Sequence, residues 1–159
     1  MADIKRPGFI PHSLVALPRQ ADLTQAPQHP DGESGHFYKI EDDTLIWSAL
    51  CPEKKVRTVY KMYRHRGSIS WQRENAFQFR VEREFASLAY LQKNHLATTP
   101  PLSWTCGVNA DHGRYEILCM QELPDSEALS DLVKQGRTRE IDFPRLFQVL
   151  RAMHVAGVY

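Results

Sequence analysis

Short runs of β-branched and aromatic residues, separated by turn signals, occupy residues 37 to 63. The runs cover residues 37–40, 44–50 and 56–63. Glu41-Asp42-Asp43 separates the first two runs, and a Pro-containing segment, 51–55, separates the second from the third. Runs of this length and composition are typical of strands. Tight turns between consecutive strands predict an antiparallel meander.

A helical pattern follows over about residues 71 to 94. Its apolar residues recur at spacings of three and four, which indicates one buried face: Phe77, Val81, Phe85, Leu88 and Leu91. Pro100 and Pro101 mark the end of this helical region.

The pattern then changes to two further strands and two helices. Residues 102–107 and 115–120 read as strands joined by a turn at 109–113, and 126–134 as a short helix. Asp142 is a suitable N-cap for a last helix, and Pro144 suits its first turn. Four apolar positions predict its buried face: Leu146, Val149, Leu150 and Met153. This order predicts an α+β fold, a five-stranded antiparallel sheet with the long helix on one face.

The chain divides into three expected parts: an arm over 1–36, the sheet and long helix over 37–123, and the last helices over 124–159. The arm is rich in Pro, Gln, Asp and Gly and is expected to be flexible. Its apolar residues can still dock as a short segment: Phe9, Ile10, Leu14, Val15 and Leu17.

Composition excludes several function classes. The 159 residues carry a formal net charge of +1, which gives no electrostatic drive toward nucleic acid. The longest apolar stretch, 45–51, is too short to span a bilayer, and no signal-peptide core is present, so a cytoplasmic location is expected. Cys51, Cys106 and Cys119 lack the spacing of a zinc site and are expected as free thiols.

Five segments in this order resemble the small lobe and the start of the large lobe of the protein-kinase-like fold. They are 59–63, 83–88, 117–123, 128–132 and 150–159. Within that superfamily the chain resembles the bacterial lipopolysaccharide kinases that act on Kdo or heptose, in the segments 59–67, 80–91 and 99–102. The resemblance implies that ATP binds, with Lys61 at the phosphates, Glu84 as its partner, Met120 at the back of the pocket, and backbone groups of Gln121, Glu122 and Leu123 at the adenine.

The residues themselves favour a pairing of Lys61 with Glu84. Lys61 lies between Tyr60 and Met62 on a strand, so its side chain faces away from theirs. Glu84 lies on or beside the apolar face of the helix, where a carboxylate needs a partner. Glu82 is the alternative partner for Lys61. An exposed strand lysine, with Glu84 paired locally to Arg80 or Arg83, also remains open.

Two departures from the family pattern bear on activity. Residues 41–44 stand where a Gly-rich loop would lie, and acidic side chains disfavour phosphate there. In the family, the catalytic aspartate, the metal ligands and the acceptor site lie beyond the position of Tyr159. No catalytic or metal-binding residue is therefore assigned here, and Mg²⁺ is expected only with a C-terminal half.

A basic cluster, Arg64, His65, Arg66 and Arg73, could meet an anionic lipopolysaccharide core or membrane headgroups. Acidic neighbours such as Glu74 favour a solvated loop instead.

The sequence thus predicts the ATP-binding segment of a kinase-like phosphotransferase that is inactive alone. Its expected partners are a nucleotide and either a lipopolysaccharide core sugar or a complementary C-terminal half. A location peripheral to the inner membrane stays open. Two alternatives remain: a non-catalytic, pseudokinase-like module that acts through a partner, and an unrelated α+β binding domain.

Overall fold

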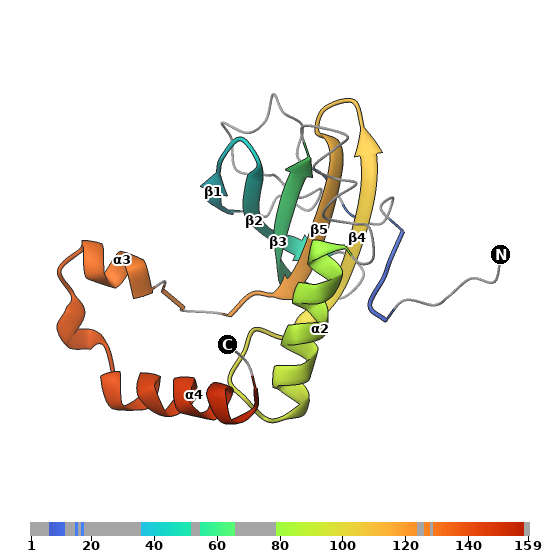
Figure 1. Ribbon diagram of the computed structural model, residues 1–159. Coiled ribbons are helices and arrows are strands. Elements are labelled where there is room, and N and C mark those ends of the chain that lie inside the picture. Colours follow the sequence, from blue (N-terminus) through green and yellow to red (C-terminus); the bar gives the residue numbers. More distant parts are fainter. Residues whose placement is uncertain are drawn as a thin grey trace.

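The computed structural model describes residues 7–11, 15, 17, 36–51, 55–65, 79–123, 126–127 and 129–157. Five strands form one antiparallel sheet in the order β1-β2-β3-β5-β4 (Figure 1). They are β1 (His36–Ile40), β2 (Thr44–Cys51), β3 (Val56–His65), β4 (Pro101–Asn109) and β5 (Gly113–Gln121). The predicted α+β class, the five strands and their antiparallel pairing are confirmed.

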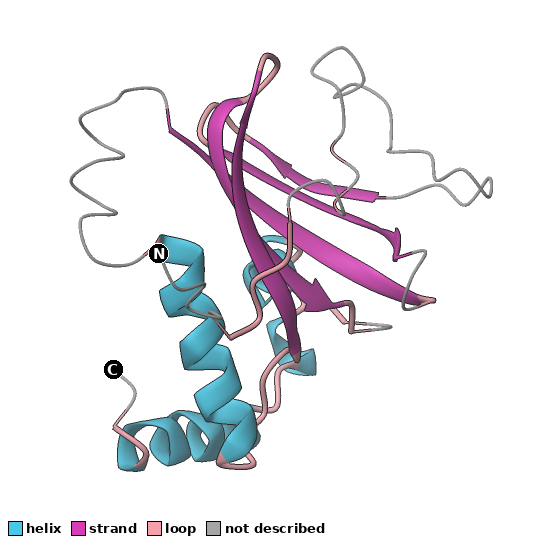
Figure 2. Ribbon diagram, turned by 90° about the vertical axis from the view of Figure 1, so that its right-hand side faces the viewer, coloured by secondary structure: helices cyan, strands magenta, loops and turns pink. Residues whose placement is uncertain are grey.

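The helix α2 (Arg80–Lys93) packs on one face of the sheet, against β4 and β5 (Figures 1 and 2). A small core lies between them, made by Tyr63, Val81, Trp104 and Leu118. The expected start at residue 71 is wrong in one respect: the helix does not run through Phe79, which is extended with φ −63° and ψ 146°. Residues 71–78, with Phe77, lie outside the described residues.

The opposite face of the sheet is also buried. Its core is formed by Leu45, Trp47, Tyr60, Met62, Tyr115, Ile117, Cys119 and Val15. Alternation along β3 sends Tyr60 and Met62 to this face and leaves Lys61 and Tyr63 on the side of α2. Each central strand therefore contributes to two cores, which explains why its sequence is apolar at so many successive positions.

The N-terminal segment takes part in this packing. Phe9 makes a parallel bridge to Trp104 of β4, and the backbone of Trp104 bonds to Gly8 and Ile10 at 2.8 and 3.0 Å. The Trp104 indole N–H donates to the carbonyl of Pro7 at 2.8 Å. Docking of the apolar residues of the arm is confirmed for Phe9, Ile10, Val15 and Leu17, whereas Leu14 lies outside the described residues.

After the sheet come α3 (Leu129–Lys134), the 3-10 turn η3 (Thr138–Glu140) and α4 (Phe143–Val155). The short helix thus begins at Leu129 and not at residue 126. Asp142 caps α4 as predicted, accepting the N–H of Arg145 at 3.0 Å. A hydrogen bond of 3.0 Å from the Tyr90 hydroxyl to the Ala156 carbonyl links α2 to the end of α4. Of the helices described, none combines the length and apolarity needed to cross a bilayer.

Candidate functional site

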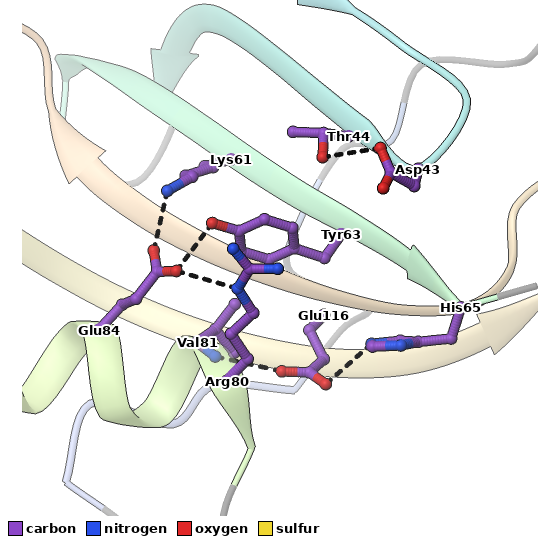
Figure 3. A network of polar contacts seen from close by, with 9 residues as sticks. All are labelled: Asp43, Thr44, Lys61, Tyr63, His65, Arg80, Val81, Glu84 and Glu116. Atoms are coloured by element: carbon purple, nitrogen blue, oxygen red, sulfur yellow. Dashed lines mark hydrogen bonds and ion pairs between the residues drawn. The ribbon is translucent and has the colours of Figure 1, made fainter. Parts of the chain in front are cut away.

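Lys61 and Glu84 form an ion pair between the sheet and the helix. The Lys61 Nζ lies 3.0 Å from the Glu84 Oε2 (Figure 3). Strand alternation directs Lys61 toward α2, and Glu84 lies one turn into the helix, facing the sheet. Both side chains are partly buried, with 29% and 28% of their surfaces exposed. The predicted pair of Lys61 with Glu84 is confirmed.

The second oxygen of Glu84 has two further donors. The Tyr63 hydroxyl donates to Oε1 at 2.7 Å, and the Arg80 Nε lies 3.3 Å from the same oxygen. The local pairing with Arg80, left open from the sequence, thus coexists with the pair to Lys61. Tyr63 was missed, although its place two residues after Lys61 puts both on one face of the strand.

The charges of the pair stabilise each other. Burial disfavours the Lys61 ammonium, but the hydrogen bonds with Tyr63 and Glu84 outweigh it and raise the pKa of Lys61. Burial likewise disfavours the Glu84 carboxylate, but the hydrogen bonds from Tyr63 and Lys61 lower the pKa of Glu84. Burial, together with the hydrogen bond to Glu84, raises the pKa of Tyr63, so its hydroxyl keeps its proton. Near neutral pH the site therefore holds an ammonium, a carboxylate and a neutral phenol.

Two cavities lie along this face of the sheet and share Met120. The first, of about 440 Å³, is lined by Lys61, Arg80, Arg83, Glu84, Ser87, Leu88, Leu118 and Met120. The second, of about 470 Å³, is lined by His36, Tyr38, Ile46, Val59, Thr99, Met120, Gln121, Leu123, Ser126, Glu127 and Asp131. Because Met120 lines both, the two cavities adjoin each other. The cavity beside Lys61 has more charged side chains in its lining than the cavity beside residues 121–123. The apolar lining from β2 and β3, Ile46 and Val59, was not identified from the sequence.

Two of the three backbone N–H groups in the segment 121–123 are bonded within the fold. The N–H of Gln121 donates to the Pro100 carbonyl at 2.9 Å, and the N–H of Glu122 donates to the Arg57 carbonyl at 2.9 Å. Leu123 is the one of these three residues whose N–H meets no acceptor within the described parts of the chain. The N–H groups of Gln121 and Glu122, two of the backbone groups expected at the adenine, are therefore already bonded within the fold.

The side chain of Glu122 serves another purpose. It accepts hydrogen bonds from the Tyr38 hydroxyl and the Arg57 guanidinium, and it lines a separate cavity of about 470 Å³. Burial disfavours its charge, but the bonds from Tyr38 and Arg57 lower the pKa of Glu122. The carboxylate thus ties β1 and β3 to the end of β5.

A second buried polar group lies at the start of α2. Glu116 of β5 is 0% exposed; its Oε1 lies 2.9 Å from the His65 Nε2, and its Oε2 accepts the backbone N–H of Val81 at 3.1 Å (Figure 3). His65 is therefore not part of an exposed basic cluster, because its ring is held inside the fold by Glu116. Arg64 bonds to the carbonyl of Glu41 in the β1–β2 turn, while Arg66 and Arg73 lie outside the described residues.

The geometry supplies a cation beside one cavity, and a second cavity that shares Met120 with it is lined partly by apolar side chains and by Leu123. Such a surface suits an elongated ligand with an anionic end and a flat apolar end. No cluster of three or more His, Cys, Asp or Glu side chains suited to a metal ion occurs among residues whose positions are described. Comparisons of the chain with protein-family models, curated proteins and solved structures give no match.

Proposed function

We propose that this chain binds ATP, or a closely related nucleotide, as the ATP-binding segment of a kinase-like phosphotransferase. The observation that carries the proposal is the Lys61–Glu84 pair at 3.0 Å, set beside a cavity that shares the lining residue Met120 with a second cavity. Phosphoryl transfer depends mainly on positioning and on stabilisation of charge, so a lysine held by a carboxylate is the central requirement for the nucleotide.

The phosphates would bind at Lys61. An ammonium has three donors, and its hydrogen bonds with Glu84 and Tyr63 leave one for a phosphate oxygen. Arg80 and Arg83 line the same cavity and add positive charge. Tyr63 and Arg80 also hold the Glu84 carboxylate in place. Glu84 therefore has a fixed position from which it can orient Lys61.

The base would lie in the second cavity. Ile46 and Val59 offer apolar contact from the sheet, Met120 forms the boundary with the phosphate end, and Leu123 supplies the backbone N–H. A flat ring between apolar side chains, fixed by a few polar groups, is a common mode of small-ligand binding. The apolar side chains of this cavity and the cations of the first support a nucleotide as the ligand.

The proposals for the acceptor and for the catalytic groups rest on the sequence resemblance. The segments 59–67, 80–91 and 99–102 favour a lipopolysaccharide-core sugar as the acceptor. We propose that the catalytic carboxylate and the ligands for Mg²⁺ come from a complementary C-terminal half, so that this chain alone binds ATP without turning it over.

A non-catalytic module that acts through a partner is the second candidate. The observation in its favour is α4, which has no buried residue among those described and exposes Phe147, Leu150 and Val155. Leu146, Val149 and Met153 are also partly exposed, so the apolar face predicted for this helix is not covered by the described parts of the chain. Apolar exposure of this extent on one helix is typical of a contact surface.

ATP binding can be tested by titration calorimetry on the purified chain, with Lys61→Ala as the test variant. Loss of a charge-assisted contact is expected to weaken binding roughly 10- to 100-fold. Lys93→Ala, an exposed lysine in the last turn of α2, is the matched control and should bind like the wild type. Absence of ATP binding by the wild type, or equal binding by Lys61→Ala, would refute the proposal.

Turnover tests the claim that this chain is inactive alone. An assay of ATP consumption with a deacylated lipopolysaccharide core is expected to show none for this chain alone. Turnover abolished by Lys61→Ala would show that the chain carries its own catalytic group. Turnover that survives Lys61→Ala would place the reaction outside this site.

A further inference from the structure

Tyr63 meets the ion pair from inside the core. Only 5% of its surface is exposed, and its ring packs with Val81, Trp104 and Leu118. Its hydroxyl reaches the Glu84 Oε1 at 2.7 Å, while Lys61 takes the Oε2 at 3.0 Å (Figure 3). The two oxygens of one carboxylate are thus held by two residues of the same strand, spaced two apart.

We propose that Tyr63 is a positioning residue for Lys61, whose hydroxyl fixes the Glu84 carboxylate and thereby holds the ammonium ready for the nucleotide. The inference rests on the proposed function, because it assigns Tyr63 a part in nucleotide binding at that site. A partly exposed lysine–glutamate pair is weakly restrained, since both side chains are long and keep several rotamers. A tyrosine has few rotatable bonds, and a buried ring gives its hydroxyl one location.

The aromatic ring also organises the cations. The Arg80 guanidinium carbon lies 3.8 Å from the centroid of the Tyr63 ring, and the Lys61 Nζ lies 5.1 Å from it. Cations are attracted to the faces of aromatic rings at these distances. Tyr63 therefore contacts three charged side chains of the site, Lys61 and Arg80 through its ring and Glu84 through its hydroxyl.

A neutral donor has an advantage over another cation at this place. It stabilises the carboxylate without adding a third positive charge to those of Lys61 and Arg80, which already pair with Glu84. Tyr63 thus keeps Glu84 ionised, and the Glu84 carboxylate in turn keeps Lys61 charged and oriented. A residue that only filled the core would need the ring but not the hydroxyl.

The test is Tyr63→Phe in the full chain, which removes the hydroxyl and keeps the ring. Tyr60→Phe is the matched control, because Tyr60 is a buried tyrosine of the same strand that faces the opposite core. Two quantities are measured: the dissociation constant for ATP by calorimetry, and the pKa of Glu84 by carboxyl carbon NMR. Tyr63→Phe is expected to weaken ATP binding about two- to tenfold and to raise the pKa of Glu84. Tyr60→Phe is expected to change neither quantity.

A change of stability in Tyr63→Phe with an unchanged Glu84 pKa and unchanged ATP binding would overturn the inference. The effect of Tyr63→Phe should also vanish in a Glu84→Ala background, and persistence there would contradict it. If the wild type binds no ATP, the proposed function fails, and the Glu84 pKa still shows whether Tyr63 holds the carboxylate. If Tyr63→Phe does not fold, exchange of the Tyr63 hydroxyl proton in the wild type decides: slow exchange supports the bond to Glu84, and rapid exchange refutes it.

Discussion

The backbone N–H of Val81 donates to the buried Glu116 carboxylate at 3.1 Å, so a residue of β5 caps a helix that begins 36 positions before it in sequence order, at Arg80. Phe79, the residue before the helix, offers no side-chain cap. An acceptor at this point satisfies a free N–H and places negative charge at the positive end of the helix. The start of α2, and with it the place of Glu84, is therefore fixed from the sheet.

Glu116→Ala should destabilise the protein by about 2–5 kcal/mol, because Val81 and His65 both lose this buried acceptor. Glu116→Gln should recover part of the loss, since the amide oxygen can still accept one bond. Glu82→Ala, at a partly buried glutamate in the first turn of the same helix, is the control and should cost less, about 1 kcal/mol. Urea unfolding measures all three, and equal effects of the two alanine variants would contradict the assignment.

Gly8→Ala should loosen the N-terminal segment from the sheet. Gly8 has φ +75°, and an added Cβ would lie 2.3 Å from the Phe85 ring. Gly113→Ala isolates the backbone cost, because Gly113 has φ +65° with open space around it. The strained backbone alone costs about 1–2 kcal/mol, and Gly8→Ala should lose more because Phe85 must also move. Denaturant unfolding of both variants is the measurement, and a smaller loss for Gly8→Ala would show that the segment does not pack on α2.

Local sequence signals predicted the strands, the succession of elements along the chain and the cap at Asp142. Alternation and capping act between near neighbours and can therefore be read locally. They did not predict the start of α2, since Glu116 sets it through a contact between distant positions. They also did not predict that Trp104 binds the segment at Gly8 and Ile10. The Lys61–Glu84 pair was predictable from two local patterns, the strand face of Lys61 and the helix face of Glu84. Tyr63 was within reach of the same argument, but its hydroxyl contact depends on how α2 seats on the sheet.

The Lys61–Glu84 pair should stabilise the fold only within a definite pH window. The pKa of Glu84 is lowered on folding, so its contribution is complete above the unfolded value, near 4.3, and is lost as pH falls through the folded pKa. The pKa of Lys61 is raised on folding, so its contribution is complete below about 10.4 and is lost as pH rises through the folded pKa. The pair therefore contributes fully between about pH 4.3 and 10.4.

Unfolding of the wild type and of Glu84→Gln across pH 3 to 7 provides the measurement. The difference between the two proteins should be constant above about pH 5 and should shrink below about pH 4. Other carboxylates titrate equally in both proteins, so their contributions cancel. A difference that grows as pH falls would show that Glu84 is not held as the carboxylate.

Phe147→Ser tests whether the Phe147 side chain lies on the surface or contributes to a core. Phe147 of α4 is 64% exposed, so its loss should change the free energy of unfolding by no more than about 0.5 kcal/mol. Met62→Ala, at a fully buried position of β3, should cost about 2–5 kcal/mol. The exposed ring, together with Leu150 and Val155, should instead drive self-association, which sedimentation velocity detects as a concentration-dependent shift. Phe147→Ser should reduce that shift while leaving ATP binding unchanged. A large loss of stability in Phe147→Ser would mean that α4 packs against the described fold in solution, and the case for α4 as a contact surface would then fall.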